Sequence, residues 1–194
     1  MFRASFRVIA VVVFALTLSG CISARSMVDP GFQKVTYDDV KRRSEPLRLK
    51  LAVEFQRNGE HFPKVDSTIQ DQAERVLRAS GVITPTADGP DGDIRVVVNN
   101  IADKGTAIAK GIGTGLTFGL AASVVTDSYE MDVMVNSKGK TAEKRGIRHA
   151  IHTTVGNALL PEAAEAMPPS TAFGRVFEQM LLYALREMQN NGEL

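Results

Sequence analysis

The sequence predicts an α+β domain in which two amphipathic helices cover one face of a four-stranded sheet with mixed or antiparallel pairing. Two kinds of segment lead to this prediction: those in which apolar and polar residues alternate, and those with apolar residues at helical spacing. Their order along the chain, β-α-β-β-β-α with a glycine-rich insert, is the third observation. Packing the apolar helix stripes against the apolar side of the sheet buries both in two layers.

The first half of the domain is predicted to be a strand, a helix and a second strand. Residues 47–55 alternate between apolar and mostly polar side chains, which is typical of a strand with one wet face. A helix follows, because Ser67 and Gln70 match a capping box and Gly81 supplies a stop. Residues 94–101 contain three consecutive valines, which predicts a central strand buried on both faces.

The second half is predicted to be a hairpin followed by the longest helix. Strands at residues 129–135 and 146–155 are joined through an irregular turn around residues 137–140. Residues 171–189 then form a helix that ends at the Asn-Asn-Gly sequence after it. Its apolar stripe consists of Phe173, Val176, Phe177, Met180, Leu181, Ala184, Leu185 and Met188.

The N-terminal residues have the pattern of a secretion signal. Arg3 and Arg7 precede residues 8–18, an uncharged and mostly aliphatic run. As a helix this run spans about 16 Å, which is short of the ~30 Å hydrocarbon core of a bilayer. The run ends in Leu18-Ser19-Gly20-Cys21, and Cys21 is the single cysteine of the chain.

This pattern resembles the lipobox of bacterial lipoproteins. In that family the signal is cleaved before the cysteine, whose sulfur carries a diacylglycerol and whose new amino group usually receives a further acyl chain such as palmitate. The resemblance implies that residues 1–20 are removed and that Cys21 holds the protein on a membrane. An ordinary secretion signal with an incidental cysteine is the alternative. Ile22 stands where an aspartate would favour the inner membrane, so the resemblance implies the periplasmic side of the outer membrane.

Composition limits the remaining classes of function. Residues 1–20 hold two of the 23 basic residues and none of the 22 acidic ones, so residues 21–194 carry 21 basic and 22 acidic residues. This near-neutral balance without a basic tail argues against nucleic-acid binding. With Cys21 lipidated, no thiol remains for a disulfide or a thiolate zinc site. Residues 21–46 are expected to be the lipidated N-terminus and a linker, and residues 47–194 a single domain.

A glycine-rich segment, residues 105–127, interrupts the domain. Gly111, Gly115 and Gly119 are spaced by four, so they share one face of a helix, and they also share one face of a strand. On a helix such a face permits close contact with a second helix. We therefore treat these glycines as a candidate interaction face for a second copy, an envelope protein or the membrane. A flexible or tightly packed connection beside the sheet is the alternative.

No catalytic residue, metal ligand or cofactor is predicted. His149 and His152 are three apart on a predicted strand, so they point to opposite faces and do not chelate one ion together. Glu130 and Asp132 share a strand face, where Arg145 or Arg148 is expected opposite them.

Taken together, these patterns predict a membrane-anchored envelope lipoprotein that acts as a non-catalytic binding or assembly component. Two alternatives stay open. An envelope hydrolase would require a pocket in which Glu130, Asp132 and His149 converge. A carrier of lipids or small molecules would require an apolar cavity between the sheet and the two helices.

Overall fold

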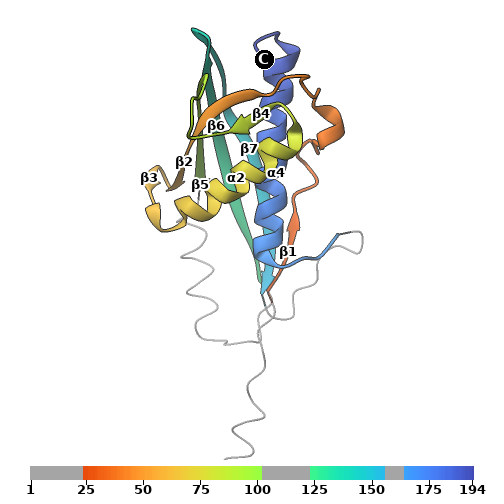
Figure 1. Cartoon of the computed structure of the whole chain (residues 1–194). Helices are drawn as coiled ribbons and strands as arrows, with labels where there is room; N and C mark the ends of the chain where they lie inside the picture. The colour runs from red at the N-terminus through yellow and green to blue at the C-terminus, as the bar shows by residue number, and fades with distance from the viewer. Residues whose placement is uncertain (1–23, 102–122, 156–163) are drawn as a thin grey trace, which may run out of the picture.

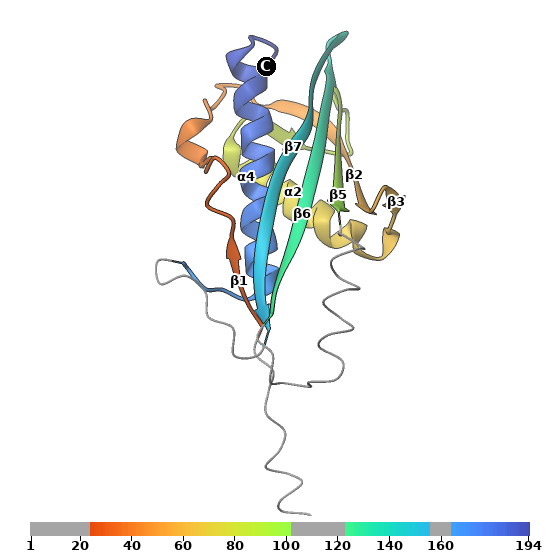
Figure 2. The same cartoon turned by 180° about the vertical axis from the view of Figure 1, so that it is seen from behind.

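The computed structural model of the chain describes residues 24–101, 123–155 and 164–194. Within these residues, seven strands form one mixed sheet, and the two α-helices lie together on one of its faces (Figures 1 and 2). The strand order is β1-β7-β6-β5-β2-β3, with β4 also paired to β2. The pairs β2–β4 and β2–β5 are parallel, and the others are antiparallel. The elements are β1 Arg25–Val28, η1 Tyr37–Asp39, β2 Leu47–Arg57, β3 Glu60–His61, η2 Pro63–Val65, α2 Asp66–Ser80, β4 Ile83–Pro85, β5 Gly92–Ile101, β6 Ser123–Ser137, β7 Lys140–Val155 and α4 Pro169–Asn190.

The α+β class is confirmed, but the predicted number of strands is too small. The four predicted strands correspond to β2, β5, β6 and β7, and the structure adds β1, β3 and β4. These three have four, two and three residues, so they are too short to show an alternating pattern of their own. They form because a longer strand already offers them an edge for pairing.

Residues 24–46 belong to the folded unit, which differs from the linker expected there. Strand β1 pairs with β7, and Ser26 exchanges two backbone hydrogen bonds with Met167 at 2.8 and 2.9 Å. Val35 and Val40 are only 1% and 5% exposed in the core. The sequence does not reveal this packing, because isolated valines among charged and turn-forming residues have no detectable period.

The β6–β7 hairpin is longer and more regular than the sequence predicts. Its turn consists of Lys138 and Gly139, with φ angles of 51° and 74°, as in the tight turns that join twisted antiparallel strands. One bulge interrupts the ladder at Gly146, whose φ is 64°. Strand β6 begins at Ser123, so the last residues of the predicted insert, 123–127, are strand.

Both predicted helices are present, with small corrections. Gly81 ends α2 with a φ of 69°, as expected for a left-handed cap. The helix begins at Asp66 directly after η2, so Ser67 lies inside it and does not cap it. The stripe of α4 is buried from Val176 to Met188, on the side that packs against the sheet.

The core lies between the helices and one face of the sheet only. Residues of β5 alternate between buried and more exposed positions, so the expected burial of this strand on both faces is wrong. Strand β5 is central in the strand order, but no described helix covers its second face. Among the described residues, no helix combines the length and the apolar character needed to cross a bilayer.

Candidate functional site

Two neighbouring hollows run along α4, between this helix, β7, β1 and the residues that precede η1. The first has a volume of about 420 Å³ and includes Lys144, Tyr183 and Gln179 in its lining. The second has a volume of about 560 Å³ and lies beside β1 and Met167. Phe32 and Gln179 line both hollows. We refer to the two together as the α4 groove.

His149 lies at the floor of the groove and has partners on every side. It is 3% exposed, and the ring of Phe32 stacks on it with centroids 4.9 Å apart. The backbone N–H of Ala150 donates to Nδ1 at 2.9 Å, so Nδ1 carries no hydrogen. The hydrogen is therefore on Nε2, which donates to Oε1 of Gln179 at 3.0 Å. This pairing assigns a neutral imidazole that links β7 to α4.

The charged groups at the first hollow are matched by partners. Nζ of Lys144 lies 3.9 Å from Oε2 of Glu187, whereas the side chain of Arg148 pairs with Glu130 on the other face of the sheet, where its Nε lies 3.1 Å from Oε2. Lys144 also lies over the ring of Tyr183, 5.6 Å from its centroid. Pairing of this kind leaves the rim polar without a concentrated charge of one sign.

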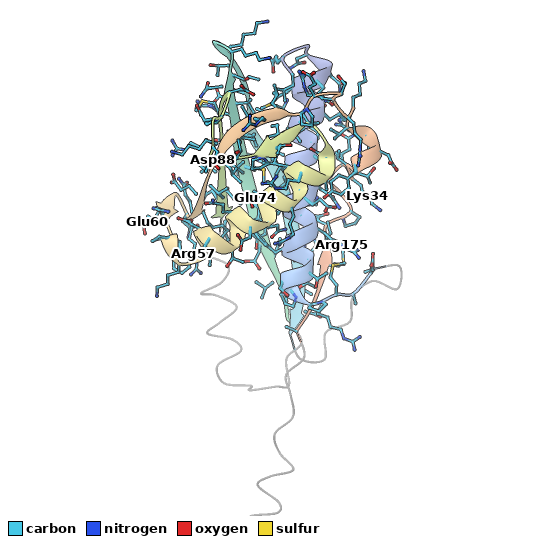
Figure 3. All side chains as sticks on the ribbon, in the orientation of Figure 1. Lys34, Arg57, Glu60, Glu74, Asp88 and Arg175 are labelled. Carbon is cyan, nitrogen blue, oxygen red and sulfur yellow. The ribbon has the colours of Figure 1, made fainter. Side chains whose placement is uncertain are left out.

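The second hollow is more apolar inside and carries charges at its edge. Lys34 and Arg175, both labelled in Figure 3, are among its lining residues. Nη1 of Arg175 lies 2.5 Å from Oε2 of Glu165. This hydrogen bond and the charge of the guanidinium hold the pKa of Glu165 below its ordinary value.

The structure separates the acidic and histidine residues considered for an enzyme site. Glu130 pairs with Arg148, which confirms that part of the expected pairing, and Oδ1 of Asp132 accepts the backbone N–H of Gly146 at 2.8 Å. Both acidic residues are on the sheet face opposite the helices, whereas His149 faces α4. These three residues therefore do not converge on one pocket.

His149 and His152 point to opposite faces of β7, as their spacing predicts. His152 has its own partners: Nε2 lies 3.1 Å from Oδ2 of Asp29, and Nδ1 lies 2.9 Å from Oγ1 of Thr126. In the described part of the chain, no three His, Cys, Asp or Glu side chains come together in a way that would hold a metal ion.

Cys21 and the candidate glycines Gly111, Gly115 and Gly119 lie outside the described residues. The structure does position the residues beside them. Ala24 is described and precedes β1, while Ile101 and Ser123 flank the gap that contains the glycines.

The groove itself is a feature that sequence reasoning missed. Phe32 lies in the stretch expected to be a linker, and Gln179 belongs to the predicted α4 helix without any motif around it. Of these three residues, only His149 is of a type that suggests a function from the sequence, namely metal binding or catalysis. The three meet because β7 and α4 pack together and the residues before η1 cross over them.

No protein-family model matches the sequence, and no curated protein matches it. Among solved structures, the chain is similar to a variant of PelC from Paraburkholderia phytofirmans, described as a dodecamer. The identity is 15%, 84% of this chain and 96% of that chain are covered, and the TM-score is 0.30. It is also similar to a DUF4136 family protein from Bacteroides thetaiotaomicron, with 13% identity, 90% and 97% coverage and a TM-score of 0.26. At these TM-scores the likenesses support no argument about function.

Proposed function

We propose that the protein is a lipid-anchored component of the bacterial envelope, held through Cys21 on the periplasmic side of the outer membrane, and that it binds or assembles without catalysis. The observation that carries the proposal is the short distance between the lipobox and the folded unit. Strand β1 begins at Arg25, four residues after Cys21. Four extended residues reach about 14 Å at most, so an acylated Cys21 would hold the domain at the membrane surface.

The α4 groove supports the binding part of the proposal. It is concave, has an aromatic floor at Phe32 and carries paired charges at its edge. Binding sites commonly combine an apolar lining with a few placed polar groups. The buried titratable side chain at its floor, His149, uses both ring nitrogens for contacts within the protein.

The anchor is tested by expressing the wild type, Cys21→Ser and Ser23→Ala in a Gram-negative host with labelled palmitate. We expect the wild type and Ser23→Ala to incorporate the label, to float with outer membranes and to begin at Cys21 by mass spectrometry. Cys21→Ser removes the only acceptor thiol and should lose the label entirely. A wild-type chain that is cleaved elsewhere, or that carries no lipid, would refute the proposal.

Assembly is tested by cross-linking in cells, followed by size analysis and mass spectrometry of the products. We expect a discrete oligomer or partner complex in the wild type that Gly115→Leu abolishes, because a larger side chain obstructs close packing at a glycine face. Circular dichroism of the purified variant is the control. A variant that loses the folded domain would indicate instead that Gly115 serves internal packing.

A further inference from the structure

The exposed apolar side chains gather at one end of the sheet. Among the described residues, the large hydrophobic side chains that are clearly exposed are Ile101 at 40%, Val124 at 43% and Val125 at 43%. Val124 and Val125 begin β6, and Ile101 ends β5 opposite Ser128 of the same strand. All three therefore lie toward the start of β6, the strand that begins at the lower end of the sheet in Figure 1, with Ile101 further along than the two valines.

The same end holds the start of the folded chain. Arg25 is in register with Thr154, and Thr154 is in register with Val124 on its other side. Neighbouring strands lie about 4.8 Å apart, which places the backbones of Arg25 and Val124 about 10 Å from each other. Cys21 is at most about 14 Å of extended chain from Arg25. A lipid on Cys21 would thus keep Val124 close to the bilayer.

Charge at this end is also suited to a membrane surface. The residues that begin β1 and β6 and end β7 at the tip include no acidic side chain, and Arg25 is exposed; the nearest carboxylate on β6 is Asp127, which follows Thr126 and lies before the level of Ile101. The residues at the tip are Arg25, Ser26, Ser123, Val124, Val125, Thr126, Thr153, Thr154 and Val155. Anionic headgroups repel carboxylates and attract a nearby arginine by about 1 kcal/mol.

We propose that this end of the sheet, formed by Arg25, Ile101, Val124 and Val125, lies against the lipid bilayer that holds Cys21. We refer to it as the apolar end. The inference rests on the proposed lipid anchor and adds the orientation of the domain. The opposite end, at the Lys138–Gly139 turn, then points away from the membrane. Val124 is 13 residues from Ser137 along β6, so the two ends are about 40 Å apart.

The experiment uses the absence of tryptophan from the chain. Val124→Trp and Ile101→Trp each place a single fluorophore at the apolar end, and Lys140→Trp is the matched control beside the hairpin turn. Each lipidated full-length variant is reconstituted into vesicles of phosphatidylethanolamine and phosphatidylglycerol with brominated acyl chains. We expect at least twofold quenching and a blue-shifted emission for the two reporters at the apolar end, and an unchanged spectrum for Lys140→Trp.

Flotation of the same vesicles separates the two proposals. If the lipidated variants float but neither Val124→Trp nor Ile101→Trp is quenched, the orientation is refuted and the anchor stands. A blue shift without quenching also refutes it, because a second copy or another part of the chain then covers the apolar end. Equal quenching of all three reporters would also refute the orientation, because the domain would then lie flat on the membrane. If the wild type does not float, the lipid anchor itself is refuted. Two reporters on different strands keep the test valid if one variant fails to fold.

Discussion

The two ends of the β6–β7 hairpin are specified in different ways. At the turn, backbone geometry is demanding: Lys138 and Gly139 adopt positive φ angles, and a Cβ on Gly92 of the neighbouring strand would lie 1.9 Å from the carbonyl oxygen of Asn136. At the apolar end, Val124 and Val125 are each 43% exposed. We therefore expect substitutions at the turn end to change the stability of the fold more than substitutions at the apolar end.

The largest effect is expected at the turn end, for Gly92→Ala. Its Cβ would collide with backbone atoms of β6, which cannot rotate away as a side chain can, so we expect a loss of about 3 kcal/mol in unfolding free energy. Urea denaturation measures this loss. The matched control is Gly174→Ala in α4, where the atom nearest to the added Cβ is a side-chain atom, Nε2 of Gln72, at 3.4 Å. Since alanine favours a helix over glycine, the control should gain up to about 1 kcal/mol. Similar losses of unfolding free energy in both variants would show that the backbone conflict at Gly92 is not what destabilises Gly92→Ala.

An intermediate effect is expected midway between the ends, where Tyr129 is buried. Burial, assisted by the charge of Asp127, raises the pKa of Tyr129 to about 12 from an ordinary 10.0. The unfolded chain therefore loses its tyrosine proton first as the pH rises. Stability should be unaffected by this group below about pH 10 and should fall between about pH 10 and 12, by about 2 kcal/mol for Tyr129.

Tyr129→Phe is the control for this pH dependence, measured by urea denaturation at several pH values. The variant should show a shallower fall in unfolding free energy above pH 10. Part of the decrease in unfolding free energy should remain in the variant, because Tyr37 also titrates late in the folded protein. Burial and Glu178 raise the pKa of Tyr37, whose hydroxyl donates to Glu178 at 2.9 Å. An unchanged slope in Tyr129→Phe would mean that Tyr129 titrates normally in the folded protein.

The smallest effect on stability is expected at the apolar end, for Val125→Thr. The substitution keeps the β-branched shape and places a hydroxyl at a half-exposed position, so the unfolding free energy should change by less than about 0.5 kcal/mol. Val133→Thr, at a buried position of the same strand, is the matched variant and should lose about 1–3 kcal/mol because its hydroxyl is taken out of water. Equal losses would show that Val125 is part of the core after all.

Features that depend on neighbouring residues in the chain were predictable. The alternation in residues 47–55 led to β2, the stripe of α4 led to its buried face, and Gly81 marked the end of α2. Strand period also placed His149 and His152 on opposite faces of β7. In each case the deciding period or residue type is contained within one element.

Local sequence patterns were sufficient to predict the two helices, the four long strands and the motif that indicates a lipid anchor at Cys21, because each depends on a short stretch of chain. Contacts in the folded protein were needed to define the short strands, the inclusion of residues 24–46, the α4 groove and the gathering of Ile101 with Val124. These features join residues far apart in sequence, as when Oγ of Ser26 lies 2.8 Å from Oγ1 of Thr153, 127 positions later. No local pattern encodes such a contact, since its partner exists only once the sheet has formed.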